Sequence, residues 1–192
     1  MELKINPVKA FNVSPQLLVL KNKFAENISK KLDQKIGIEI LDNLDDKMIE
    51  DIAQVEKEGF YPKPPYSYDY FIMLTKMKDF RTVIVKNFSG DVIGFALGYH
   101  EPYFNQSNTY FIDVVAFKDG YRRQGIGTAL FHFMEPLIRE MGYKKITFFP
   151  FSRDVDGMDL RKYYQEVLGY TYLDDKTFGS RMEKDISLFS HP

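Results

Sequence analysis

The sequence contains no cysteine, and this absence excludes several kinds of chemistry. Without a thiol the chain cannot form a disulfide framework, a cysteine nucleophile or a zinc ribbon. Histidine is scarce as well, and His100, His132 and His191 lie too far apart in the sequence to make a local metal cluster. We therefore expect no metal site.

Long apolar runs and a strong net charge are also missing. No segment approaches the roughly 18–20 apolar residues that cross a membrane, and the N-terminal residues show no apolar secretory segment. The formal charge of −1 provides no broad attraction for nucleic acid or for an anionic membrane surface. We expect neither partner, and a soluble cytoplasmic protein is the default.

Tryptophan is absent too, but 44% of the 192 residues are hydrophobic, which is enough for the core of one domain. Residues 1–34 form a predicted N-terminal helical extension, because Ser14 and Pro15 are typical of a helix start and apolar residues follow at helical spacing from Leu17 to Leu32. We prefer packing of this helix on the domain body. Pairing with a partner, as in a homodimer, is the alternative.

The rest of the chain, residues 35–192, alternates between strand-like and helix-like patterns. Strands are expected at 36–41, 82–85, 92–99, 110–117, 145–149, 170–173 and 181–188. Helices are expected at 45–58, 67–77 and 158–167, and a further helix opens within 121–130 and ends near 141. This order predicts an α/β fold with a mixed, largely antiparallel central sheet flanked by helices.

The most informative segment is Tyr121–Leu130, YRRQGIGTAL, between an expected strand and an expected helix. A glycine-bearing turn at a helix start gathers free backbone N–H groups and the positive end of the helix dipole, so it suits a phosphate. Gly125 and Gly127 let the backbone approach the anion closely, while Arg122 and Arg123 add positive charge. The segment therefore predicts a phosphorylated ligand.

Two common nucleotide motifs do not fit this segment. A dinucleotide fingerprint needs a third glycine where Leu130 stands, and a P-loop needs a Gly-Lys pair that the chain lacks. The remaining pattern, Arg-x-x-Gly-x-Gly, resembles the pyrophosphate-binding signature of the GNAT superfamily of acetyl-CoA-dependent N-acyltransferases. The expected element order is also that of the GNAT fold, so the resemblance covers about residues 35–188 and implies a GNAT domain at 35–192.

The resemblance implies a binding site for acetyl-CoA as co-substrate. In that family two central strands splay apart, and backbone groups of the fourth strand bind the pantetheine arm. The matching strand positions are Val115, Ala116 and Phe117, and the pyrophosphate positions are Arg122, Arg123, Gln124, Gly125, Ile126, Gly127 and Thr128.

A tyrosine is the implied general acid. Residues 159–170 resemble the GNAT segment ending in aromatic-Tyr-x-x-Leu-Gly-Phe, whose tyrosine protonates the CoA sulfur, and Tyr164 is the candidate. Tyr164 lies five residues before Gly169, whereas in the family the tyrosine lies four residues before the glycine. Since one residue turns a helix by about 100°, either the helix end is distorted or Tyr163 is the better match.

Asp113 is the candidate general base. Strand alternation predicts that it shares one face with Val115 and Phe117. A carboxylate on an otherwise apolar strand is costly unless it is paired or used in chemistry. A structural ion or hydrogen-bond partner is the other interpretation, and His100 with Glu101, at the end of the preceding strand, is the alternative base.

The resemblance also implies that residues 56–70 border the acceptor. Acidic and aromatic side chains there, including Phe60, Tyr61 and Tyr66, suit a cationic amine, with His100 and Glu101 nearby. We therefore predict an N-acetyltransferase acting on a polyamine, a lysine side chain or a peptide N-terminus by direct attack in a ternary complex. A catalytically silent CoA-binding sensor or scaffold module is the alternative, and a longer acyl donor is a third option.

Overall fold

A computed structural model describes residues 13–60, 63–102, 108–176 and 179–187 of the chain. In these ranges the elements are α1 (Pro15–Leu32), β1 (Gly37–Leu41), α2 (Asp46–Gly59), α3 (Tyr68–Leu74), β2 (Arg81–Lys86), β3 (Val92–Tyr99), β4 (Thr109–Phe117), α4 (Ile126–Glu140), β5 (Lys145–Phe148), α5 (Leu160–Glu166), β6 (Thr171–Asp175) and β7 (Gly179–Asp185). None of the described helices is long and apolar enough to cross a membrane.

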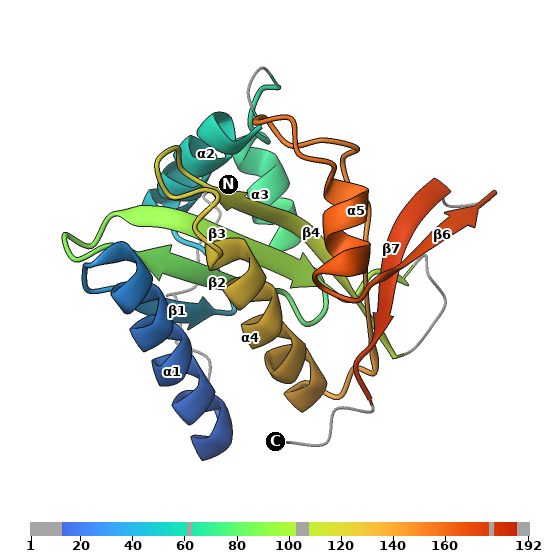
Figure 1. Cartoon of the computed structure of the whole chain (residues 1–192), viewed down its shortest axis with the longest axis horizontal. Helices are drawn as coiled ribbons and strands as arrows, with labels where there is room; N and C mark the ends of the chain where they lie inside the picture. The colour runs from blue at the N-terminus through green and yellow to red at the C-terminus, as the bar shows by residue number, and fades with distance from the viewer. Residues whose placement is uncertain (1–12, 61–62, 103–107, 177–178, 188–192) are drawn as a thin grey trace, which may run out of the picture.

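The strands form one seven-stranded sheet in the order β1-β2-β3-β4-β5-β7-β6. All neighbours are antiparallel except β4 and β5, which confirms the predicted mixed, largely antiparallel sheet. Helices α1 and α4 lie over one face and α2 and α3 over the other (Figure 1), and each face has its own apolar cluster. The fold is thus a layered α/β structure with helices on both sides of the sheet.

Helix α1 packs on the body of the protein. Its N-cap Ser14 accepts a hydrogen bond from the Leu17 N–H at 3.1 Å, as the Ser-Pro start predicts. The Phe24 ring stacks on Phe133 of α4 with the centroids 5.3 Å apart, and Ile28 is fully buried. The preferred interpretation of the N-terminal helix therefore agrees with the structure, in which α1 lies beside α4 (Figure 1).

Strands β4 and β5 separate soon after they meet. They pair only where 109–111 runs beside 145–147, so β4 from Ile112 onward has no strand beside it on that side. The unpaired edge leaves backbone groups of β4 available to a ligand. A wedge between two central strands is what the resemblance implied.

A β-bulge in β4 changes which way its side chains point. Across the β3–β4 ladder Leu97 pairs with Val114 and Gly98 with Ile112, so Asp113 is the extra residue. On the N-terminal side of the bulge, Ile112 belongs to the apolar cluster on the face covered by α1 and α4, and on its C-terminal side Val115 packs against the same cluster. The alternation of side chains between the two faces of the sheet therefore shifts by one residue at the bulge.

The prediction that Asp113 shares one face with Val115 and Phe117 is therefore wrong. It assumed unbroken alternation along the strand, and the bulge breaks it. Instead, the Asp113 carboxylate accepts a hydrogen bond from the Tyr70 hydroxyl of α3 at 3.0 Å.

Candidate active site

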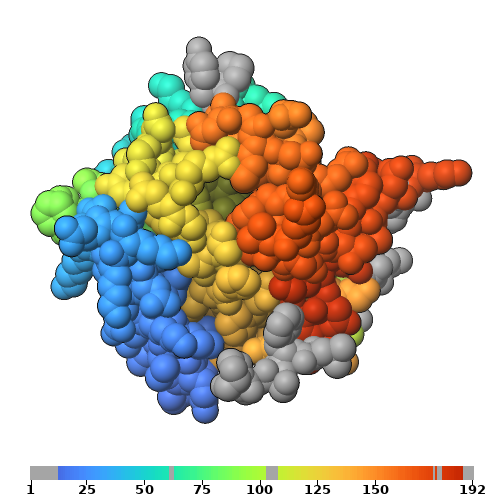
Figure 2. Space-filling view, viewed as in Figure 1, coloured from blue at the N-terminus to red at the C-terminus, as the bar shows by residue number. Residues whose placement is uncertain are grey.

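A cavity of about 540 Å³ opens where β4 and β5 diverge. Its walls are β4, the turn before α4, the end of β5 and the segment from Pro150 to Tyr164. Figure 2 shows its mouth as a hollow between the yellow turn that leads into α4 and the orange segment that includes α5. We call this cavity the cleft.

Most of the predicted site residues border the cleft. Those that line it are Phe60, Asp113, Val115, Ala116, Phe117, Arg122, Arg123, Gly125, Gly127, Thr128 and Tyr164. Tyr61 lies outside the described residues. The predicted residues that do not line it are Tyr66, His100, Glu101, Gln124 and Ile126. The His100 ring is 5.9 Å from the ring of Tyr143, and Ile126, the first residue of α4, has a buried side chain.

The turn before α4 has the features of an anion site. Its N-cap, Gly125, has a left-handed backbone (φ 73°), and no side-chain hydrogen bond caps the helix. The first helical bond runs from the Ala129 N–H to the Gly125 carbonyl at 3.1 Å. The amides of Ile126, Gly127 and Thr128 thus precede the helical hydrogen-bond ladder, which leaves donors that a phosphate can use.

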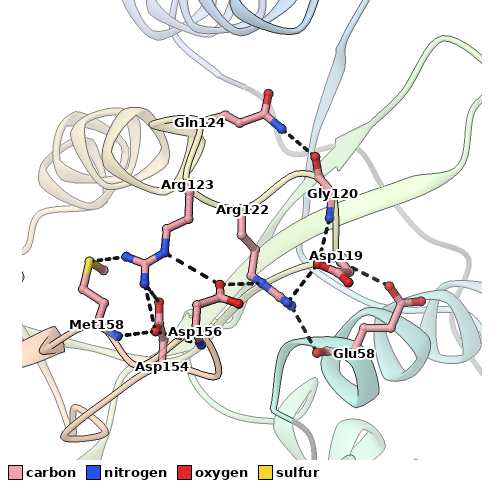
Figure 3. Close-up of polar contacts among 9 residues, drawn as sticks. All are labelled: Glu58, Asp119, Gly120, Arg122, Arg123, Gln124, Asp154, Asp156 and Met158. Atoms are coloured by element: carbon pink, nitrogen blue, oxygen red, sulfur yellow. Dashed lines mark hydrogen bonds and ion pairs between the residues drawn. The ribbon is translucent and has the colours of Figure 1, made fainter.

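Both arginines of this turn are held by carboxylates (Figure 3). Arg122 contacts Asp119 at 3.1 Å and Asp156 at 3.3 Å, and its Nη1 donates to the Glu58 carbonyl at 3.2 Å. Arg123 contacts Asp154 at 3.2 Å, and its Nε lies 3.7 Å from Asp156. These pairs connect the turn to the loop that follows β5.

Sequence reasoning missed that loop, residues 149–158, as part of the site. Several of its residues line the cleft, including Phe149, Phe151 and Met158. Phe149 ends the strand expected at 145–149 and Met158 begins the helix expected at 158–167, but neither was assigned to the site. Residues 150–157 between them have no helical or strand periodicity, so no element was expected there. Its one signal is the aromatic run that continues directly from β5 into the cleft wall.

The two candidate tyrosines occupy different positions. The Tyr164 ring packs between Phe131, at 5.6 Å, and Phe148, at 4.7 Å. The Tyr163 hydroxyl instead lies 2.9 Å from Thr128 Oγ1 in the first turn of α4. Burial raises the pKa of the Tyr164 hydroxyl well above its ordinary value, so Tyr164 stays protonated at neutral pH.

The end of α5 explains the unusual spacing. The Tyr170 N–H donates to the Tyr164 carbonyl at 2.9 Å, a closure one residue wider than a Schellman motif, and Gly169 is left-handed with φ 71°. Of the two alternatives, a distorted helix end is the one that the structure has. The extra residue is taken up after Tyr164.

Carboxylates and tyrosines surround Asp113. Burial raises the pKa of Asp113 to about 6, and the nearby Glu101 adds to this while the Tyr70 hydrogen bond opposes it. Burial likewise raises the pKa of Glu56 to about 7, although its Oε2 accepts the Tyr66 N–H at 2.9 Å.

Glu56 is a further residue that sequence reasoning missed. It stands four residues after Ile52, on the apolar face of α2, and that position was its signal.

One comparison with known proteins identifies a family. The family model described as "Acetyltransferase (GNAT) family" matches residues 47–170. No curated protein sequence matches the chain significantly.

Three solved structures illustrate the shared fold. The ribosomal-protein-S18-alanine N-acetyltransferase from Escherichia coli has a TM-score of 0.60 at 17% identity over 81% of this chain and 96% of that one. A spermidine/spermine N-acetyltransferase from Vibrio cholerae has a TM-score of 0.56 at 15% identity over 82% and 95%. The PaiA N-acetyltransferase from Thermoplasma acidophilum, solved with coenzyme A, has a TM-score of 0.52 at 18% identity over 78% and 99%.

Proposed function

Because the chain belongs to the GNAT acetyltransferase family, we propose that it transfers an acetyl group from acetyl-CoA to a primary amine by direct attack in a ternary complex. The amine belongs to a polyamine, a lysine side chain or a peptide N-terminus. One observation carries the proposal: the uncapped start of α4, Asp113 and Tyr164 all border one cavity of about 540 Å³.

The residues present fit the donor. The left-handed Gly125 and the amides at the start of α4 form a concave site for the pyrophosphate, and the free edge of β4 offers backbone groups to the pantetheine arm. The cavity volume falls within the roughly 300–1,000 Å³ of small-molecule sites. When bound, acetyl-CoA supplies an activated thioester carbonyl.

Proton transfers are assigned to two side chains. Asp113 accepts a proton from the attacking amine as the new carbon–nitrogen bond forms, directly or through a water molecule. As the carbon–sulfur bond breaks, the Tyr164 hydroxyl donates its proton to the departing thiolate, which gives free CoA and leaves a tyrosinate that is reprotonated from solvent. Since the chain has no cysteine, no acetyl-cysteine intermediate precedes this transfer.

The surroundings of Asp113 favour a cationic acceptor. Glu56 and Glu101 lie close enough to interact electrostatically with Asp113 or with its tyrosine neighbours. The rings of Tyr66 and Tyr70, 4.2 Å apart, add aromatic faces on which an ammonium group can rest. One of the similar structures is named for spermidine and spermine and another for an alanine of ribosomal protein S18, and both polyamine and protein acceptors are compatible with this chemistry.

The catalytically silent module is the alternative function. Its main support is the unusual spacing, in which Tyr164 lies five residues before Gly169, and the wide turn at the end of α5 is where the structure accommodates the extra residue. We do not propose the silent module as a second function, and the test below distinguishes it from acetyl transfer.

The test is release of free CoA from acetyl-CoA in the presence of polyamines, amino acids or short peptides with free N-termini. We expect release that depends on one amine class, with the acetylated amine identified by mass spectrometry. Binding of acetyl-CoA without release for any amine in the panel would contradict transfer and favour the silent module.

A further inference from the structure

Helix α1 ends beside the turn that leads into α4, residues 121–125, which we call the phosphate turn. A Cβ placed on Gly125 would lie 2.8 Å from the Nζ atom of Lys31, so this amino group sits directly against the N-cap of α4. Lys31 belongs to the last turn of α1. The chain thus brings a cation from an N-terminal helix to the point where the donor phosphates are expected.

The position of α1 is fixed by packing rather than by Lys31 itself. Ile28, one turn before Lys31, is fully buried, and the Phe24–Phe133 stack joins the helix to α4. At the other end Ser14 hydrogen-bonds the Glu140 carboxylate of α4. Because α1 is held along its length, the last turn is presented to the phosphate turn without help from a ligand.

Lys31 differs from Arg122 and Arg123 in having no carboxylate partner among the described residues. Arg122 and Arg123 are paired with Asp119, Asp154 and Asp156. Lys31 makes no hydrogen bond or ion pair within the part of the chain that the structure describes. An arginine must exchange a carboxylate for a phosphate, whereas Lys31 can add a new pair, so its charge contributes more to the net affinity.

We infer that Lys31 is a phosphate-binding residue of the donor site and contacts the pyrophosphate of acetyl-CoA at the start of α4. This rests on the proposed function. Lys31 lies outside residues 47–170, the part that matches the family model, so the donor site of this chain is completed by its N-terminal helix.

Lys30 provides a matched control. It is the other basic residue in the last turn of α1, is exposed, and interacts equally with the dipole of that helix. Any effect of charge on helix stability or on general attraction should therefore appear in both Lys30→Gln and Lys31→Gln. Only a direct phosphate contact separates them.

The experiment is calorimetric titration of the full chain and both variants with CoA, dephospho-CoA and pantetheine. We expect Lys31→Gln to weaken CoA and dephospho-CoA binding about fivefold, to leave pantetheine binding unchanged, and to lose its effect at high salt. Lys30→Gln should stay within twofold, and Lys31→Arg should retain most of the affinity. Equal thermal unfolding of all variants checks the fold.

Two results would overturn the inference. Equal loss of CoA affinity in Lys30→Gln and Lys31→Gln would mean that Lys31 acts only through general electrostatic attraction. A loss of affinity for CoA but not for dephospho-CoA would mean that Lys31 contacts the 3′-phosphate rather than the pyrophosphate. Failure of the donor site as a whole looks different, because the unsubstituted chain would then bind none of the CoA compounds. Failure of acetyl transfer alone would leave CoA binding intact and would show only in the CoA-release assay.

Discussion

At the scale of single residues, Asp113 has the two properties that a general base needs. It borders the cleft, and burial raises its pKa to about 6. An ordinary aspartate holds a proton too weakly to take one from an amine efficiently, whereas a group with a pKa near 6 binds it better and is still largely ionised at pH 7. The bulge in β4 gives Asp113 this environment by turning it toward Tyr70.

Replacing Asp113 with asparagine should lower kcat at least a hundredfold, the scale of general base catalysis. The base works only when ionised, so kcat/KM of the unsubstituted chain should rise with pH through about 6 and level off above it. The variant should lack this rise, and Asp69→Asn, at an exposed carboxylate of α3, should keep it. The measurement is kcat/KM from pH 5 to 9, and persistence of the rise in Asp113→Asn would exclude Asp113 as the base.

Tyr164→Phe should lower kcat by roughly ten- to a hundredfold while the Kd for CoA stays within twofold. The substitution removes the hydroxyl and leaves the ring in place between Phe131 and Phe148. Steady-state kinetics and calorimetry check the two halves of this prediction. A normal rate in Tyr164→Phe together with a slow Tyr163→Phe variant would transfer the role to Tyr163.

At the scale of elements, the loop after β5 and the phosphate turn are joined by shared carboxylates. Asp156 interacts with both Arg122 and Arg123, so it neutralises part of the charge that the donor needs. Asp156→Asn should therefore tighten CoA binding about threefold, since both arginines become freer to pair with phosphate.

Calorimetry with CoA measures this change, and Asp51→Asn, at an ion pair with Lys47 on α2, is the control. Weaker binding in Asp156→Asn would mean that the ion pairs serve to order the loop over the cleft rather than to compete with the donor.

The order of helices and strands was predictable, because periodicity and turn residues decide it locally. The bulge at Asp113 was not, since it depends on how β4 aligns with β3. A Cβ on Gly98, opposite the bulge, would lie 2.3 Å from the Phe111 carbonyl oxygen, and only the paired strands create that contact. The phosphate turn was predictable from its glycines, whereas two of its three carboxylate partners, Asp154 and Asp156, come from a loop without a pattern.

At the scale of the whole molecule, α1 is part of the folded unit. Phe24→Ala should reduce the free energy of unfolding by about 3–4 kcal/mol, because it removes a buried ring stacked on Phe133. Urea unfolding should show one transition with a lower midpoint. Phe88→Ala, at a residue that is 73% exposed, should change the free energy of unfolding by less than about 0.5 kcal/mol. A separate early transition in Phe24→Ala would show that α1 unfolds independently.

The measurement that tests the central claim most directly is calorimetric titration of acetyl-CoA into the unsubstituted chain, Gly125→Glu and Gly90→Glu. Both glycines are left-handed, with φ of 73° and 87°, so both variants place a side chain on a left-handed backbone and add one negative charge. They differ in place, since a Cβ on Gly125 meets Lys31 and one on Gly90 has nothing within 4 Å. The account predicts binding of one equivalent by the unsubstituted chain and by Gly90→Glu, and none by Gly125→Glu. Unchanged binding by Gly125→Glu, or no binding by the unsubstituted chain, would contradict it.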